Sequence, residues 1–178
     1  MRLFIAFDTS EELKKEVLKL KKTSSFEKIS FIPISNLHVT IKFLGEVHNP
    51  EKIVETLEKI SFKTFEITNS KLGFFPNKNF ISVIWIGFEK CDELLELKTV
   101  IDNSIGEIFK EEYDYIPHLT LARVNWLSDE QKIKLKELSK KELFKETFKV
   151  SSFKLMKSTL TKDGHVYESI REFKAKGL

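Results

Sequence analysis

Short segments in which apolar and polar residues alternate are separated along this chain by segments with the helical period. Two alternating segments, residues 38–45 (HVTIKFLG) and 118–124 (HLTLARV), predict strands, because successive side chains of a strand point to opposite faces. Other extended segments are predicted over residues 2–7, 64–72, 80–87, 147–157 and 166–173. Helices are predicted over about residues 10–22, 50–60, 92–109 and 128–141.

The order of these elements occurs twice. The first half reads strand, helix, strand, helix, strand, and the second half repeats this order. A shift of 80 residues carries His38 onto His118 and Phe4–Phe7 onto Ile84–Gly87. This pattern predicts one unit over residues 1–178, built from duplicated β-α-β-α-β halves of roughly 1–78 and 79–178. No low-complexity linker separates the halves, so we expect two lobes that pack together.

Composition narrows the class of protein. The chain has 178 residues, of which 41% are hydrophobic and 32% charged, as in soluble globular proteins. Its net charge of +3 is too weak for a dedicated nucleic-acid binder, although a local basic cleft remains compatible with it. The single cysteine, Cys91, excludes an internal disulfide and a zinc framework. No segment reads as a membrane span or signal peptide, and we therefore expect a cytoplasmic location and no membrane partner.

Each of the two strands 38–45 and 118–124 begins with a His-x-Thr motif. Residues i and i+2 of a strand share a face, so His38 lies beside Thr40 and His118 beside Thr120. If the lobes are related by a two-fold-like duplication, these polar faces meet across a cleft. Strict alternation assigns the opposite, apolar faces to the core, with Val39, Ile41 and Phe43 on the first strand and Leu119 and Leu121 on the second.

Two histidines and two threonines in such a cleft suit displacement at phosphorus. Imidazole titrates near neutral pH, so one ring can accept a proton while the other donates one on the opposite side of the phosphate. Threonine hydroxyls can donate hydrogen bonds to the non-bridging oxygens. No carboxylate stands at ligand spacing beside either histidine, and neither a metal nor a cofactor is predicted. One His-x-Thr is weak evidence, but its recurrence at the same place in a repeat favours a functional role.

The motif segments HVTIKFLG and PHLTLARV resemble the paired signature of the two-histidine phosphoesterase superfamily. Within it, they are most similar to the RNA 2′,3′-cyclic phosphodiesterase family, also called 2′-5′ RNA ligase-like proteins. The segments MRLFIAFD and LMKSTLTKDGHVY also resemble that family, so the similarity covers essentially the whole chain. It implies an α+β fold with two lobes of largely antiparallel sheet, outer helices and one motif per lobe around a central cleft.

The resemblance also implies an activity, the hydrolysis of RNA 2′,3′-cyclic phosphate ends to 2′-phosphomonoesters. In that reading His38 is the proton donor to the leaving 3′-oxygen and His118 is the proton acceptor that activates water. Thr40 and Thr120 bind the phosphate. The symmetry of the motifs alone does not distinguish the acid from the base, so this assignment rests on the resemblance.

Two cationic residues are further candidates for substrate binding. Arg123 matches a family position that holds the phosphate or the ribose. Strict alternation turns it away from His118, so a bulge or a twist at the strand end would be needed to bring it into the cleft. Lys42 has the parity of His38, and is predicted either to supply positive charge to the cleft or to be a solvated strand lysine.

Other residues have weaker assignments. An aromatic side chain is expected to stack on the base of the nucleotide, and Tyr113, Tyr115 and Phe7 are candidates, although each also fits a role in the core. His48 and His165 lack the motif and are predicted to be solvated surface residues.

The expected partners are RNA with 2′,3′-cyclic phosphate ends or cyclic nucleotides, and no obligate protein partner is predicted. Two alternatives remain open. The first is reversible 2′-5′ ligation of RNA at the same site. The second is a non-catalytic module that binds RNA ends, against which the two titratable rings argue because binding alone would not need them.

Overall fold

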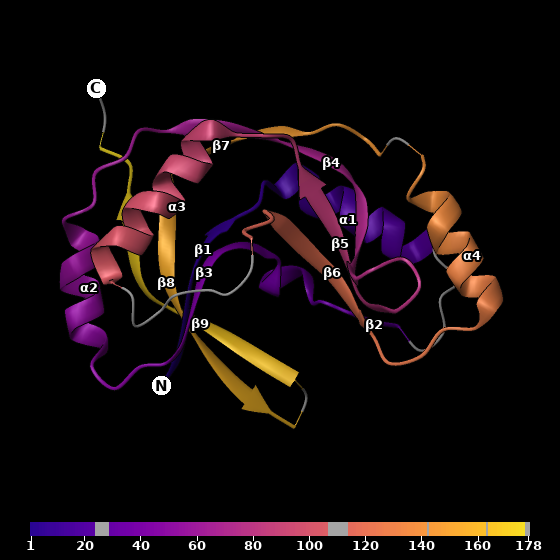
Figure 1. Ribbon diagram of the computed structural model, residues 1–178, viewed down its shortest axis with the longest axis horizontal. Coiled ribbons are helices and arrows are strands. Elements are labelled where there is room, and N and C mark those ends of the chain that lie inside the picture. The colour runs from indigo at the N-terminus through magenta and orange to yellow at the C-terminus, as the bar shows by residue number, and fades with distance from the viewer. Residues whose placement is uncertain (24–28, 107–113, 142, 163, 177–178) are drawn as a thin grey trace.

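The computed structural model describes residues 1–23, 29–106, 114–141, 143–162 and 164–176 (Figure 1). The first part of the chain comprises β1 (Arg2–Asp8), α1 (Glu11–Thr23), β2 (Ile29–Phe31), the 3-10 turn Ile34–Asn36, β3 (His38–Glu46), α2 (Pro50–Glu58) and β4 (Phe65–Pro76). The second part comprises β5 (Ile81–Phe88), α3 (Asp92–Ile105), β6 (His118–Val124), α4 (Asp129–Leu138), β7 (Thr147–Val150), β8 (Ser152–Thr161) and β9 (Gly164–Lys174). Within this described part, no helix is long and apolar enough to cross a membrane.

The strands form one sheet in the order β7-β4-β5-β6-β3-β1-β8-β9, and β2 pairs with β6. Every pairing is antiparallel. The predicted α+β fold with largely antiparallel sheet and outer helices is therefore confirmed. The two motif strands, β3 and β6, are neighbours at the middle of the order, and Val39 is paired with Leu119 between them.

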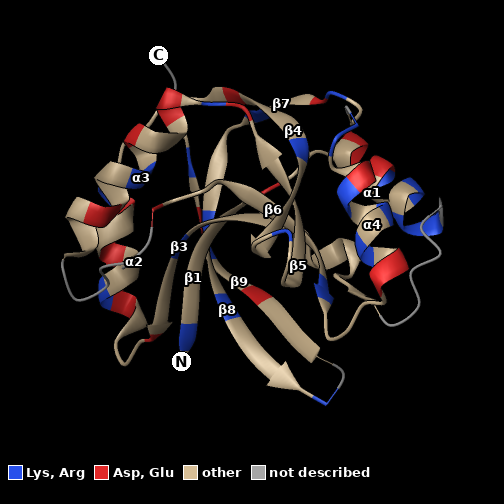
Figure 2. Ribbon diagram, turned by 45° about the vertical axis from the view of Figure 1, so that its right-hand side comes forward, with Lys and Arg blue, Asp and Glu red and all other residues tan. Residues whose placement is uncertain are grey.

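Each half of the chain contributes a strand that pairs with the other half. β4 pairs with β5, and β8 pairs with β1. We call β3-β1-β8-β9 the first lobe and β6-β5-β4-β7 the second lobe. Figures 1 and 2 place α2 and α3 beside the first lobe, and α1 and α4 beside the second. Each lobe is thus built from both halves of the chain, while the division into repeats at about residue 78 stays a prediction.

The predicted elements differ from the observed ones mainly at their ends. The strand expected over 64–72 continues to Pro76, and the extended segment 147–157 consists of two strands, β7 and β8. The short strand β2 has no counterpart among the predicted elements. The helix expected over 92–109 is described to Ile105, and its predicted end lies outside the described residues. The predicted shift of 80 residues does not hold between β1 and β5. Phe4 of β1 pairs with Phe43, and Val83 of β5 pairs with Arg123, the counterpart of Phe43. Phe4 therefore corresponds to Val83, which is a shift of 79 residues.

Both motif strands contain an irregularity at the same place. Ala6 pairs with Thr40 and Ile5 with Lys42, which leaves Ile41 as an extra residue in β3. In β6, Leu121 is the extra residue, because Thr120 and Ala122 pair with consecutive residues of β5. An extra residue reverses the alternation of faces beyond it.

This reversal corrects the prediction for Lys42. Lys42 is 2% exposed and lies on the core side of the sheet, where its Nζ forms an ion pair with Asp102 Oδ1 of α3 at 2.7 Å. Phe43, expected in the core, is 59% exposed and faces the opposite side. Its counterpart under the shift of 80, Arg123, is turned to that side in the same way.

Apolar side chains of β1 and β3 fill the core below the motif strands. Leu3, Ile5 and Phe7 of β1 are at most 1% exposed, as are Val39 and Ile41 of β3. Phe7 is therefore a core residue and does not reach a ligand. The opposite face of these strands is left to polar and aromatic side chains. Figure 2 shows charged residues of both signs along the four helices at the outside of the molecule.

The buried lysines generate a prediction about stability. Asp102 accepts from both Lys42 and Lys98, whose side chains are 3% and 8% exposed. Asp102→Ala removes the carboxylate that both ammonium groups share, and we expect a loss of about 3 kcal/mol in the free energy of unfolding. Lys42→Met leaves Asp102 paired with Lys98 and should cost less than about 1.5 kcal/mol. Urea unfolding of both variants measures the difference, and equal losses would contradict the account.

Candidate active site

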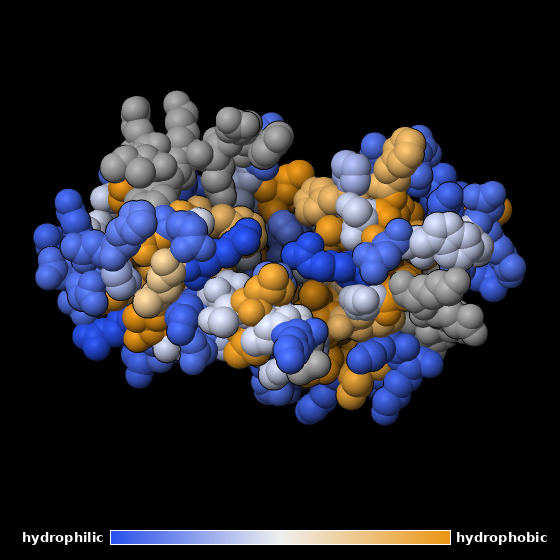
Figure 3. All heavy atoms as spheres, turned by 90° about the horizontal axis from the view of Figure 1, so that it is seen from below, coloured by the Kyte–Doolittle hydropathy of each residue, from blue (hydrophilic) through white to orange (hydrophobic). Residues whose placement is uncertain are grey.

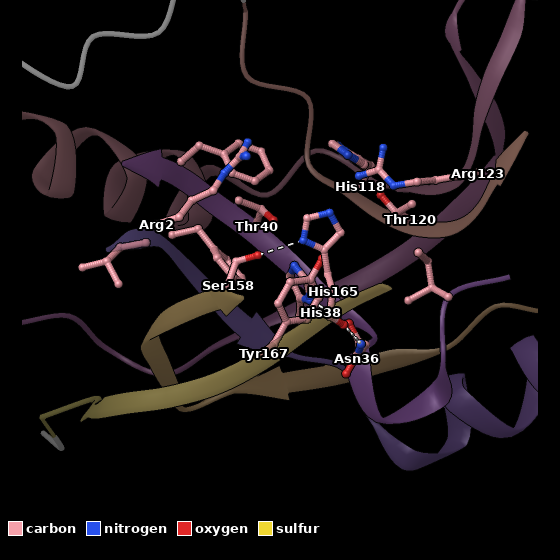
Figure 4. Close-up of a pocket in the computed structure, with 14 residues that line it drawn as sticks. Arg2, Asn36, His38, Thr40, His118, Thr120, Arg123, Ser158, His165 and Tyr167 are labelled. Carbon is pink, nitrogen blue, oxygen red and sulfur yellow. Dashed lines mark hydrogen bonds between the residues drawn. The ribbon is translucent and has the colours of Figure 1, made fainter. Parts of the chain in front are cut away.

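A cavity of about 370 Å³ opens on the polar face of the motif strands (Figure 4). This volume is within the range of small-molecule sites. Figure 3, seen from below, shows this side of the molecule hollowed between its left and right parts. The cavity brings together five of the six predicted site residues, and Lys42 is the one that lies elsewhere. The five are His38, Thr40, His118, Thr120 and Arg123.

The register between β3 and β6 sets how the motifs face each other. Because the strands are antiparallel with Val39 opposite Leu119, His38 comes opposite Thr120 and Thr40 opposite His118. The two imidazoles therefore lie on a diagonal, each beside a threonine of its own strand and across from a threonine of the other. All four side chains are partly buried. A small anion placed between the strands is within reach of groups from both lobes.

Both imidazole rings are oriented by the same kind of hydrogen bond. His38 Nδ1 donates to the carbonyl oxygen of Asn36 at 2.7 Å, and His118 Nδ1 donates to that of Ile116, also at 2.7 Å. A carbonyl oxygen can only accept, so Nδ1 carries a proton in each ring. Nε2 is then the atom of each ring that gains or loses a proton.

Two aromatic rings surround His38. The centroids of Phe4 and Tyr167 lie 4.9 and 5.1 Å from that of the imidazole. Burial lowers the pKa of His38 below its ordinary value, against the opposing effects of the hydrogen bond to Asn36 and the charge of Asp8. A positive charge on His118 would lower that pKa further.

His118 is surrounded in a similar way, by Phe75 of β4 at 5.0 Å and Trp85 of β5 at 5.9 Å between ring centroids. Gly73 makes room for the indole, because a Cβ on that residue would lie 2.2 Å from the Trp85 ring. Burial lowers the pKa of His118, and the hydrogen bond to Ile116 opposes the effect. Burial therefore favours the neutral form of both rings.

One carboxylate breaks the symmetry of the two motifs. Asp8 pairs with His38 across β1 and β3, whereas Gly87 occupies the corresponding position opposite His118. The negative charge of Asp8 favours the protonated form of His38 and so raises its pKa. Lys154 forms an ion pair with Asp8 at 2.5 Å, which partly offsets this charge.

Tyr115, a further aromatic candidate, is not among the residues that line the cavity. Tyr115 Oη donates a hydrogen bond to the carbonyl oxygen of Thr40 at 3.1 Å, and Lys98 lies over its ring. Tyr115 therefore supports the motif strand from behind. Tyr113 lies outside the described residues. Phe43 does line the cavity, and strict alternation missed it because the extra residue Ile41 reverses the faces.

Further lining residues were not predicted. Arg2, Phe4, Asn36, Ser158, His165 and Tyr167 contribute to the wall, together with Leu3 and Ile32. His165 is exposed, as expected of a surface residue, yet it also borders the cavity. The segment LMKSTLTKDGHVY, which resembles the family, contained the signal for the last three polar residues. Phe4 was hidden in an apolar strand pattern.

The cavity wall is positively charged. Its charge comes from Arg2 and Arg123, and its described lining includes no aspartate or glutamate. In the part of the chain that the structure describes, neither Arg2 nor Arg123 has an ion-pair partner, whereas the third arginine, Arg171, binds Glu58 at 2.6 Å. Such a wall attracts anions into the cavity.

Comparison with known proteins agrees with the motifs. Residues 10–162 match the family model of the 2′-5′ RNA ligase superfamily. The RNA 2′,3′-cyclic phosphodiesterase of Methanocaldococcus jannaschii is 39% identical over 97% of this chain and 100% of its own length. That of Archaeoglobus fulgidus is 33% identical, over 97% of this chain and 99% of its own.

Solved structures share the fold. A protein of Thermus thermophilus superposes with a TM-score of 0.85 at 24% identity, covering 99% of both chains. Escherichia coli LigT in complex with 3′-AMP superposes with a TM-score of 0.79 at 21% identity, covering 98% of this chain and 97% of LigT. The family match and the archaeal relatives confirm the resemblance seen in the motifs, and the chain belongs to the 2′-5′ RNA ligase superfamily.

Proposed function

We propose that this protein hydrolyses RNA 2′,3′-cyclic phosphate ends to 2′-phosphomonoesters by acid–base catalysis with two histidines. The observation that carries the proposal is the pair of rings His38 and His118, each with Nδ1 bound to a carbonyl and Nε2 left to exchange protons. The positively charged cavity around them supports an anionic substrate. The name RNA 2′,3′-cyclic phosphodiesterase borne by the archaeal relatives supports the reaction.

Each histidine carries out one proton transfer in the proposed reaction. His118 Nε2 takes a proton from a water molecule while the water oxygen attacks phosphorus, and the bond from phosphorus to the 3′-oxygen breaks. His38 Nε2 donates its proton to that 3′-oxygen, which leaves the phosphate on the 2′-oxygen. Thr40 and Thr120 donate hydrogen bonds to the non-bridging oxygens, and Arg123 offsets the developing negative charge. The exposed ring of Phe43 offers a surface for the base.

The electrostatics of the site support His38 as the acid. A general acid must hold its proton before the reaction, and Asp8 favours the protonated form of His38. No carboxylate occupies the matching position beside His118, where Gly87 stands. The bound cyclic phosphate, being an anion, raises the pKa of both rings, and Asp8 adds to this effect at His38.

The first test replaces each histidine in turn. His38→Ala and His118→Ala should each lower kcat/KM for 2′,3′-cyclic nucleotides and cyclic-ended RNA by about 10²–10⁴-fold, because each removes one proton transfer. Assays are run in EDTA, and phosphorus NMR identifies the position of the product phosphate. His48→Ala changes an exposed histidine outside the cavity and is the matched control.

The same assay separates the alternatives. Full activity in both histidine variants would end the proposal, and a 3′-phosphate product would contradict the assignment of the leaving oxygen. Adding RNA with a 5′-hydroxyl end tests for ligation. We expect hydrolysed product and no joined RNA. Tight binding of a cyclic-phosphate end without any product would instead identify a binding module.

The second test is the dependence of activity on pH. Burial lowers the pKa of both rings below the ordinary value, so kcat/KM, which reports the free enzyme, should peak below about pH 6.5. The maximum of kcat should lie at higher pH than that of kcat/KM, because the bound anion favours the imidazolium form of each ring.

Asp8→Asn tests which ring is the acid. Losing the carboxylate lowers the pKa of His38, so its proton is lost at lower pH and the alkaline limb of the kcat/KM profile should move to lower pH. Without Asp8, the positive charge of Lys154 is no longer offset, and this charge also lowers the pKa of His38. Asp129→Asn, on the exposed surface of α4, is the control. Movement of the acidic limb alone would assign His38 as the base.

A further inference from the structure

We propose that Arg2, Ser158 and His165 form a second phosphate subsite in the same cavity. Its ligand is the phosphate on the 5′-oxygen of the nucleoside that carries the cyclic phosphate. This inference rests on the proposed function, because it specifies the substrate of the same site. In RNA that 5′-phosphate is the internucleotide diester, and in a free nucleotide it is a monoester.

Arg2 and Ser158 lie apart from Thr120 and Arg123, and His165 lies between the two sides of the cavity. Arg2 comes from β1, and Ser158 and His165 from the β8–β9 hairpin. Figure 4 shows Arg2 and Ser158 on one side of the cavity, and His118, Thr120 and Arg123 on the other. The cavity thus has a guanidinium group on each of its two sides.

His165 is held in place through its ring and its backbone. Its Nδ1 lies 3.1 Å from Ser158 Oγ, and its carbonyl oxygen accepts from Asn36 Nδ2 at 3.0 Å. When the hydroxyl donates to Nδ1, Nε2 carries the ring proton and is a donor for an anionic oxygen. The same Asn36 orients His38 through its backbone carbonyl, so the hairpin and the reactive ring are fixed relative to each other.

Arg2 supplies the charge of the subsite. It has no ion-pair partner among the described residues, and Glu46, opposite it in the register, is not part of the cavity lining. Burial raises the pKa of the Tyr167 phenol, and the charges of Arg123 and Arg2 both oppose that rise. Tyr167 therefore experiences the fields of both guanidinium groups, which places two separate positive charges around one nucleotide-sized cavity.

Two positive charges match a ligand with two phosphates better than one with a single phosphate. The cyclic phosphate takes the place between His38 and His118, next to Arg123. A nucleoside cyclic phosphate without a 5′-phosphate has no group to contact Arg2, whose guanidinium then stays hydrated. A 5′-phosphate, attached to the same ribose, allows a charge-assisted contact with Arg2 and hydrogen bonds from the hairpin. RNA ends and 5′-phosphorylated cyclic nucleotides should therefore be preferred over nucleoside cyclic phosphates.

The test compares three substrates: adenosine 2′,3′-cyclic phosphate, its 5′-phosphorylated form, and the dinucleotide ending in the same cyclic phosphate. In the wild type we expect kcat/KM to be about tenfold higher for the two substrates with a 5′-phosphate. Arg2→Gln should reduce this ratio to less than about twofold, and Ser158→Ala and His165→Gln should reduce it in part. The two phosphorylated substrates distinguish a monoester from an internucleotide diester as the preferred ligand.

Arg171→Gln is the matched control, because Arg171 lies outside the cavity and pairs with Glu58. The ratio of kcat/KM between substrates with and without a 5′-phosphate should be the same in this variant as in the wild type. The proposal is overturned if Arg2→Gln and His165→Gln both retain the full ratio, or if the wild type shows no preference. Higher salt should diminish the preference of the wild type, since the contact is charged.

A binding measurement separates this inference from the proposed function. Calorimetry compares adenosine 2′,5′-bisphosphate with adenosine 2′-monophosphate on the wild type and on Arg2→Gln. Tighter binding of the bisphosphate only to the wild type supports the subsite even if no cyclic phosphate is hydrolysed. Hydrolysis of cyclic phosphates with equal binding of both probes would uphold the function and refute the subsite.

Discussion

The antiparallel contact of β3 with β6, at Val39 and Leu119, is the constraint on which the rest of the site depends. It is a single paired position between two lobes, and it fixes which residues of the two motifs are neighbours. Slippage of either strand by one residue would move its motif side chains to the opposite face. The fully buried side chains of Val39 and Leu119 hold the register, because the core on one side admits only that arrangement.

The alternation of apolar and polar residues was enough to place the four motif residues. His38 and Thr40, like His118 and Thr120, precede the extra residue in their strand, so the simple period of two applies to them. It fails at Lys42, Phe43 and Arg123, which follow the extra residue. Nothing in the local pattern marks Ile41 or Leu121 as irregular, because each is an apolar residue at an apolar position.

What the sequence could not reveal is the pairing between distant segments. Phe75 and Tyr167 are each adjacent to a motif histidine, yet they lie 43 and 129 residues from it along the chain. Their positions follow from the pairing of β4 with β5 and of β8 with β1 and β9, which no periodicity encodes. The asymmetry between the two histidines likewise depends on Asp8, whose role appears only once β1 is paired with β3.

The exchange of strands between the halves makes each histidine dependent on the whole chain. His38, in the first half, packs against Tyr167 from the second, and His118, in the second half, packs against Phe75 from the first. The pKa of each ring is lowered by burial to which these aromatic side chains contribute. A half of the chain folded alone would therefore contain a motif without the environment that tunes it. The two lobes supply similar environments from different residues, and the remaining differences, such as Asp8 against Gly87, give the two rings different electrostatic surroundings.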